Sequence, residues 1–251
     1  MNIHSRRIHS AFLLFLPLFF GYGCQTHASV TMTGTRIIYD STAKSADVQL
    51  KNNDNFPYIV TSWFDSGNIH DAPEKGRDIP FVVTPPVSRI QPNSGQVLRI
   101  VFTGAKTLPQ DRESLFWFNF MQVPPSNALQ GDDAEKQNKI LVMLRNRVKL
   151  FYRPKGLAGD PQKMLKNLQI TRLSQGGNAG VLVVNNQPYH ASLTKLTLHS
   201  TSGDFTQKAD IIVPFGSEKF FFNGAKPSGI KSVTITLVND QGARISEEYP
   251  L

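Results

Sequence analysis

Residues 139–154, KILVMLRNRVKLFYRP, constrain the fold of this chain more than any other stretch. Side chains alternate between the two faces of a β-strand, so this segment predicts a strand that is apolar on both faces where it starts. A cationic row follows, and such a strand fits a sheet in which one face meets the protein's own core and the other meets a partner. The alternative is a core strand of a β-sandwich with a solvated basic end. The cations are Arg145, Arg147 and Lys149.

Further strand-like segments recur along the whole chain with turn residues between them, which is typical of β-sandwiches. Pro154, Gly156 and Gly159 interrupt the pattern and favour a domain boundary there. We therefore predict an all-β protein with two sandwiches in series, residues 29–153 and 154–251. The expected strands cover residues 30–39, 45–51, 58–64, 81–83, 96–103, 114–123, 168–173, 180–185, 192–200, 209–213, 218–222 and 231–239.

Residues 1–28 have the pattern of a secretory signal peptide. Arg6 and Arg7 precede an apolar stretch at 11–20, and Thr26-His27-Ala28 is a small-residue cleavage site. The alternative of lipid attachment at Cys24 has a poor context in Gly21-Tyr22-Gly23. Cys24 is the one cysteine of the chain, so the mature protein is expected to be exported without disulfides.

Charge and motifs exclude several classes of function. The formal charge is +8, and removal of two arginines with the signal leaves 25 basic and 19 acidic residues, or +6. The basic residues are dispersed and no nucleic-acid motif occurs, so no nucleic-acid partner is expected. The mature chain holds no apolar run long enough to span a membrane. No nucleophile elbow, phosphate loop or metal-ligand spacing is present, which predicts no enzyme activity, no cofactor and no metal.

Several motifs together resemble one family, the PapD-like periplasmic chaperones of the chaperone–usher pilus pathway. The resemblance covers essentially residues 29–251 and is most specific in the first domain. The motifs are TRIIY at 35–39, NFPY at 55–58, TPPVSRIQP at 84–92, LPQDRESLFWFN at 108–119, VPP at 123–125, VKLFYRP at 148–154, NQPYH at 186–190, VPF at 213–215 and VNDQGA at 238–243.

The resemblance implies two immunoglobulin-like domains arranged as an L with a cleft between them. It also implies that the protein lends a strand, here about residues 138–150, to pilus or fimbrial subunits that lack one of their own. Ile140, Val142 and Leu144 would fill the subunit's groove, and Leu141 would face the chaperone's own core. Lys149 is out of phase with these three residues, so a bulge or strong twist would be needed for one ligand to contact all of them.

Other site residues are also implied by the resemblance. Arg36 and Lys149 would hold the C-terminal carboxylate of a subunit, because arginine offers a planar fork of donors and lysine a point charge. A network of charges would fix the angle between the domains, and four exposed residues would dock on an outer-membrane usher. The network is Glu113, Arg153 and Asp240, and the docking residues are Ile59, Thr84, Pro85 and Pro86. Without the resemblance, all of these are solvated charges and turn residues.

The loop before the donor strand carries no cysteine pair, which resembles the short-loop chaperones of rod-like pili. We expect a periplasmic protein whose apolar strand can also promote self-association when no subunit is bound. The alternative is a secreted β-sandwich that is itself a structural subunit or adhesin. Such a subunit would have an incomplete sandwich or an N-terminal donor extension, and neither is apparent in the sequence.

Overall fold

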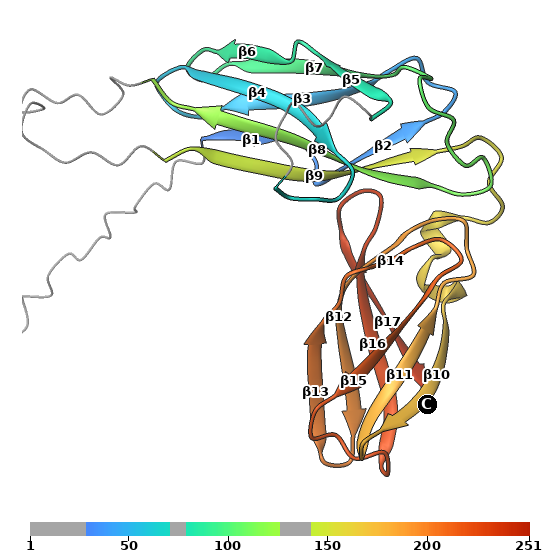
Figure 1. The fold of residues 1–251 in the computed structure, drawn as a ribbon. Coiled ribbons are helices and arrows are strands. Elements are labelled where there is room, and N and C mark those ends of the chain that lie inside the picture. The colour runs from blue at the N-terminus through green and yellow to red at the C-terminus, as the bar shows by residue number, and fades with distance from the viewer. Residues whose placement is uncertain (1–28, 71–78, 126–141) are drawn as a thin grey trace, which may run out of the picture.

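A computed structural model describes residues 29–70, 79–125 and 142–251 of the chain. The described residues form two β-sandwich domains whose long axes cross, so that the molecule has the shape of an L (Figure 1). The predicted all-β class and the two sandwiches in series are confirmed. No helix in the described ranges is both long and apolar enough to cross a membrane.

The N-terminal domain packs a four-stranded sheet on a five-stranded one. The first sheet has the order β1 (Val30–Met32), β3 (Ala46–Asn52), β7 (Gly95–Phe102) and β5 (Phe81–Thr84). The second has the order β2 (Arg36–Asp40), β9 (Leu144–Arg153), β8 (Ser114–Val123), β4 (Tyr58–Asp65) and β6 (Val87–Ile90).

The core of this domain lies between the two sheets and is rich in aromatic side chains. Phe81 contacts the rings of Tyr39, Phe64 and Phe116 at centroid distances of 5.2–5.8 Å. Leu150 of β9 and Phe118 of β8 are fully buried in the same cluster. Because burial of each such side chain is worth about 1.5–3 kcal/mol, this core holds β8 and β9 firmly in the sheet.

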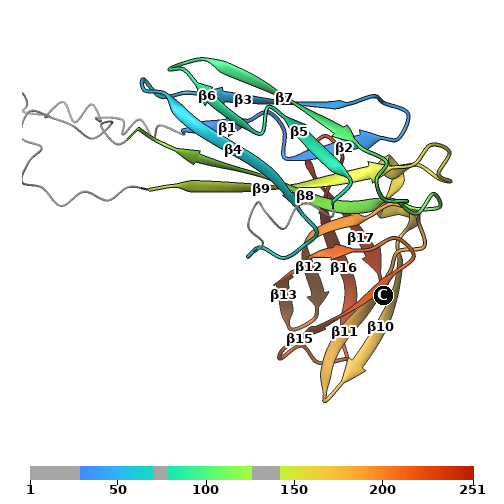
Figure 2. The ribbon, with the colours of Figure 1, turned by 45° about the horizontal axis from the view of Figure 1, so that its top comes forward.

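The C-terminal domain follows the same plan (Figure 2). One sheet has the order β10 (Gln169–Gln175), β11 (Asn178–Val184) and β15 (Ser217–Phe222). The other has β13 (Gly203–Lys208), β12 (Ala191–Ser200), β16 (Ile230–Val238) and β17 (Arg244–Pro250), and the short β14 (Ile211–Ile212) also pairs with β12. Two short 3-10 helices, η3 (Pro161–Lys163) and η4 (Leu165–Asn167), follow the linker.

The segment predicted as one strand at 30–39 is two strands in different sheets, so that prediction is wrong. The chain turns at Gly34, whose φ of 90° is accessible to glycine at little cost. Before the turn β1 pairs with β3, and after it β2 pairs with β9 in parallel. This switch leaves part of β9 without a neighbour on one side. Strands β6, β13 and β17 also lie outside the predicted segments.

Candidate binding site between the domains

Arg36 and Lys149 are direct neighbours across the parallel strands β2 and β9. Both side chains reach the C-terminal domain. The Nη1 of Arg36 donates a hydrogen bond to the carbonyl of Val238 at 2.7 Å, and the Nζ of Lys149 lies 3.8 Å from Oδ1 of Asp210. We call these two cations the anchor pair. They lie where the N-terminal sheet meets the C-terminal domain.

The anchor pair is partly removed from solvent. Burial lowers the pKa of the Arg36 guanidinium, and the carboxylate of Asp240 offsets part of that effect. Burial likewise lowers the pKa of Lys149; the charge of Arg36 adds to this, while Asp210 opposes it. Two cations side by side in a desolvated place favour binding of an anion.

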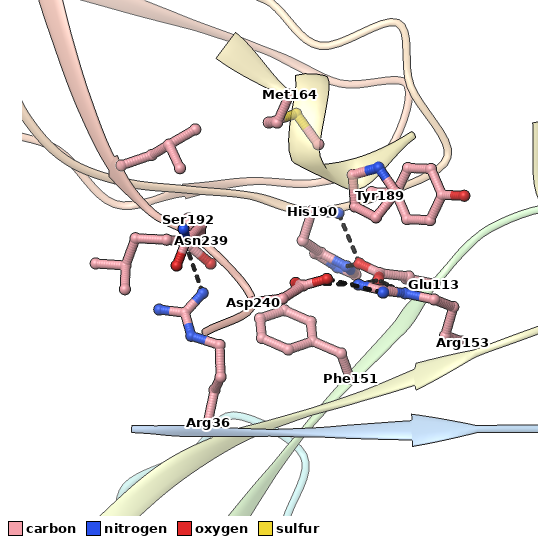
Figure 3. A pocket seen from close by; sticks show the side chains of 13 residues that line it. Arg36, Glu113, Phe151, Arg153, Met164, Tyr189, His190, Ser192, Asn239 and Asp240 are labelled. Carbon is pink, nitrogen blue, oxygen red and sulfur yellow. Dashed lines mark hydrogen bonds and ion pairs between the residues drawn. The ribbon is translucent and has the colours of Figure 1, made fainter. Parts of the chain in front are cut away.

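A small pocket at the junction contains an unused donor of the anchor pair. Arg36 projects from β2 into this pocket (Figure 3). Its Nε atom is buried and has no hydrogen-bond partner among the described residues, and the same holds for Oγ of Ser192, which also lines the pocket. A buried polar group without a partner costs about 1–3 kcal/mol, so both atoms favour a polar ligand.

Arg145 and Arg147, which precede Lys149 on β9, are held by a buried carboxylate. The Nη2 of Arg147 lies 2.5 Å from Oδ1 of Asp65, and Arg145 lies 3.5 Å from its Oδ2. Asn119 donates a further hydrogen bond to Asp65 at 2.7 Å. Burial alone would raise the pKa of Asp65, but the hydrogen bonds from Arg147 and Asn119 outweigh it and lower that pKa. Lys149 is therefore the cation of this row that Asp65 does not hold.

Tryptophan rings support the same face of the sheet. The guanidinium carbon of Arg147 lies 3.8 Å from the ring centroid of Trp117, and Nζ of Lys149 lies 5.5 Å from it. Arg145 lies over Trp63 at 4.9 Å. Cation–π contacts of this kind restrict the rotamers of long cationic side chains and so keep the row in place.

The first half of β9 has a free edge, which we define as residues 144–148. Strand β8 pairs with β9 from Leu144 to Tyr152, whereas β2 pairs with it only from Lys149 to Arg153. On the β2 side, the free edge therefore has no strand partner within the described parts of the chain. Unpaired backbone groups at a sheet edge are a template for another strand, and this edge begins directly beside the anchor pair.

The described part of β9 shows which of its two faces meets the domain core. The register of β9 against β8 is continuous from Leu144 to Tyr152, so this stretch contains no bulge. Leu144 shares its face with Val148 and Leu150, and these two pack against the domain core. The residues out of phase with Leu144 include Arg145, Arg147 and Lys149, and these three cations do not face the core. Leu144 thus lies on the core side, because side chains at every second position share one face.

The apolar start of the donor segment is exposed where the structure describes it. Val142, Met143 and Leu144 are 60%, 54% and 48% exposed. Val142 and Met143 precede the strand, which begins at Leu144. Ile140 and Leu141 lie outside the described residues, so the structure gives no orientation for either. Three consecutive exposed apolar side chains next to a free edge indicate a surface that a partner can cover.

Arg153 lies between two carboxylates at the junction of the domains. Its Nε donates to Oε1 of Glu113 at 2.7 Å, and its Nη1 and Nη2 donate to Asp240 at 2.8 and 3.1 Å. The backbone N–H of His190 donates to the other oxygen of Glu113 at 2.8 Å, and Nδ1 of the same residue lies 3.2 Å from it. We call the set Glu113, Arg153 and Asp240 the joint. Figure 3 shows these side chains converging from both domains.

The residues expected to dock on an usher lie around the connection between the two sheets: Ile59 is on β4, Thr84 ends β5 of the other sheet, and Pro85 and Pro86 join β5 to β6. Ile59 is 42% exposed and pairs with Arg89 of β6, which is the edge strand. Thr84 and Pro86 are exposed and Pro85 is half-buried, and the peptide bond between Thr84 and Pro85 is cis. Two strands, β8 and β4, separate the edge strand β6 from β9.

Comparison with known proteins places the chain in one family. Residues 29–158 match the family described as "Pili and flagellar-assembly chaperone, PapD N-terminal domain", and residues 163–249 match "Pili assembly chaperone PapD, C-terminal domain". The chain therefore belongs to the PapD family of pilus-assembly chaperones, which are not enzymes.

Individual relatives agree along almost the whole length. The "Probable fimbrial chaperone YadV" of Escherichia coli K12 is 37% identical over 243 residues, 94% of this chain and 95% of that protein. "Chaperone protein HifB" of Haemophilus influenzae is 39% identical and covers 92% of each chain. The crystal structure of the YadV chaperone has a TM-score of 0.74 at 33% identity, covering 89% of this chain and all of that one. The SafB chaperone of Salmonella enterica, solved in complex with SafA pilin, has a TM-score of 0.70 at 25% identity, with coverage of 89% and 96%.

Sequence reasoning missed four residues that complete the site. Asp210, Val238 and His190 each contact a predicted site residue, and Asp65 pairs with Arg147, two residues before Lys149 on β9. The NQPYH motif contains His190 and could have indicated it. Val238 likewise begins the VNDQGA motif. Asp65 and Asp210 carry no local signal, because each is defined only by a contact far away in the sequence. Among the described residues, no group of three or more potential metal ligands occurs.

Proposed function

We propose that this protein is a periplasmic chaperone that completes the fold of pilus or fimbrial subunits by strand addition and passes them to an outer-membrane usher. The observation that carries the proposal is the free edge of β9 directly beside the anchor pair. The edge supplies backbone hydrogen bonds, and the anchor pair supplies charge for the end of the bound strand.

The geometry favours one orientation for the bound strand. It would lie along residues 144–148 and continue the line of β2 backwards from Arg36. If its C-terminal carboxylate meets the anchor pair, the strand runs in the same direction as β2. Since β2 is parallel to β9, the subunit strand would also be parallel to β9. This orientation distinguishes the proposal from an antiparallel hairpin-like addition.

The two faces of β9 would then have separate roles. Leu144, together with Val142 and Ile140 upstream, would enter the apolar groove of the subunit, on the side that continues the chaperone's own core. Lys149 lies on the other face and would contact the terminal carboxylate. One bound subunit can contact both Leu144 and Lys149, because a strand added at the edge of the sheet has side chains on each of the two faces. No bulge is needed.

The usher would dock around the β5–β6 connection and the neighbouring β4, on Ile59, Thr84, Pro85 and Pro86. Exposed Val87 pairs with Thr61 next to Ile59 and would enlarge this apolar surface. Because β8 and β4 separate β6 from β9, an usher and a subunit could be bound at the same time. This arrangement supports transfer of a loaded chaperone.

Localisation, loop type and self-association complete the proposal. Residues 1–28 would direct export to the periplasm, and the absence of a cysteine pair supports the short donor-loop type. In the absence of a subunit, the free edge of one copy can pair with that of another. Sedimentation at increasing protein concentration measures this self-association.

Co-expression with pilus subunits tests the proposal. A chaperone purified from the periplasm should carry monomeric subunits in equal amounts and protect them from degradation. The alternative, a structural subunit or adhesin, predicts polymers of the chain itself. Homopolymers without bound subunits would therefore reject the chaperone role.

A further inference from the structure

We propose that Asp210 is an internal competitor for the subunit carboxylate: in the free protein it pairs with Lys149, and a bound subunit must displace it. The inference rests on the proposed function of the anchor pair and adds a residue that sets its affinity. Strand addition uses β9 of the N-terminal domain. The inference gives the C-terminal domain a role as well, because Asp210 belongs to it.

The position of Asp210 is determined by backbone contacts on both sides. It lies between β13 and β14, where the N–H of Ala209 donates to the carbonyl of Thr194 at 3.1 Å. On the other side, the N–H of Ile211 donates at 2.7 Å to Oδ1 of Asp210. The same Oδ1 is the atom 3.8 Å from Nζ of Lys149. A carboxylate is thus held in front of the lysine by the fold of the other domain.

The environment of Lys149 makes this contact relevant to binding. The side chain of Lys149 is 21% exposed, whereas that of Asp210 is 91% exposed. Asp65 pairs with Arg145 and Arg147. Among the described carboxylates, only Asp210 lies within ion-pair distance of Lys149. Because the carboxylate is solvated and the pair is long, displacement costs little, and the competitor weakens binding without blocking it.

Binding of a model ligand to the full mature chain tests the inference. The probe is a short synthetic peptide of alternating valine and threonine with a free C-terminal carboxylate, compared with the same peptide carrying a C-terminal amide. Calorimetry measures both peptides on the wild type, on Asp210→Asn and on Glu218→Gln. Glu218 is an exposed carboxylate of the same domain. Glu218→Gln removes one negative charge, as Asp210→Asn does, and therefore serves as the control for net charge.

Asp210→Asn should bind the carboxylate peptide about two- to fivefold more tightly than the wild type, the range expected for loss of an exposed ion pair. The amidated peptide and Glu218→Gln should show no such gain. In a Lys149→Met background, Asp210→Asn should have no effect, because the pair is already broken.

The possible failures are distinguishable. If the wild type binds both peptides equally, the proposed anchor role is wrong. If the wild type prefers the carboxylate but Asp210→Asn binds it no better, or less well, Asp210 is not a competitor. A gain that persists in the Lys149→Met background would also overturn the inference, since it would reflect the general charge of the cleft.

Discussion

Arg36 and Lys149 are neighbours across two parallel strands of the N-terminal domain, yet each contacts an acceptor of the C-terminal domain. The acceptors are the Val238 carbonyl at 2.7 Å and the Asp210 carboxylate at 3.8 Å. The anchor pair therefore depends on both domains, and it lies beside the free edge of β9. This relationship leads to the following predictions.

Loss of either anchor cation should abolish capture of subunits while the protein stays folded. A hydrogen bond to a charged group contributes about 1.5–3 kcal/mol, so Arg36→Ala or Lys149→Ala should weaken binding at least about tenfold. Co-purification of subunits from the periplasm measures the effect. Lys51→Ala removes an exposed cation of the other sheet and serves as the control. Equal protection of subunits by all three variants would contradict the anchor role.

The exposed end of β9 should tolerate a charge in the free protein but not in a complex. Leu144→Glu should change thermal stability little, because Leu144 is 48% exposed, and should prevent subunit binding through desolvation of an unpaired carboxylate. Leu150→Ala, on the same face but fully buried, should instead cost about 2–5 kcal/mol of unfolding free energy. Thermal unfolding and co-purification separate the two effects. Normal subunit capture by Leu144→Glu would argue against strand addition here.

The joint should control the angle between the domains. Arg153→Met leaves Glu113, whose side chain is 2% exposed, without its cation, and removal of one partner from a buried pair costs about 3–5 kcal/mol. Adding Glu113→Gln should recover part of the lost stability, since the orphaned charge disappears. Urea unfolding measures stability and small-angle scattering measures the domain arrangement. Unchanged midpoints and scattering profiles for Arg153→Met would show that the joint has no such role.

Asp65 should make the N-terminal domain sensitive to acid. Its pKa in the folded protein lies below the ordinary 3.8, so the unfolded chain binds more protons in the interval between the two values. The stabilisation is present above pH 3.8 and is lost as pH falls through the lower, folded-state value. Asp65→Asn should cost about 3 kcal/mol at neutral pH, the low end for a buried pair because its arginines are partly exposed.

Unfolding midpoints across acidic pH check this prediction. The wild type should lose stability more steeply with falling pH than Asp65→Asn does. Asp47→Asn is the control, because Asp47 pairs with Arg99 on an exposed surface. Parallel pH profiles for all three proteins would contradict it.

Lys149 should titrate below the ordinary lysine pKa of 10.5, since burial lowers it. A ¹³Cε NMR titration of the lysines measures this. Asp210→Asn should lower the pKa of Lys149 further, and a bound carboxylate peptide should raise it, because each carboxylate favours the charged amine. A Lys149 signal that responds to neither change would indicate that its amine faces neither carboxylate.

The pattern of the chain predicted much of the fold for a local reason. Strand β8 was expected at Ser114–Val123 and is found there, because alternation of side chains and the following Pro124-Pro125 are both encoded nearby. The first strand was not predicted correctly. Alternation indicates that residues 30–39 are extended, but it does not indicate that Gly34 moves the chain from one sheet to the other.

The faces of β9 show the same limit within the site. The sequence 139–154 showed that both faces are apolar at the start and that cations follow. It placed Leu141 on the core side, which the structure does not test. A period of two groups residues without indicating which group lies inside. Within the described part of β9, packing of Val148 and Leu150 into the core between the two sheets decides that question.

The sequence by itself determined the all-β class, the two sandwiches, and the motifs that contain Arg36, Lys149 and the joint residues. Tertiary structure alone decided that β2 covers only half of β9, that Asp65 pairs with Arg145 and Arg147, and that Asp210 and Val238 contact the anchor pair. The reason is physical. Strand and turn preferences act between residues that are close in the chain, whereas the bond from Arg36 to Val238 joins residues 202 positions apart. Such a contact exists only when two separate cores have formed and docked.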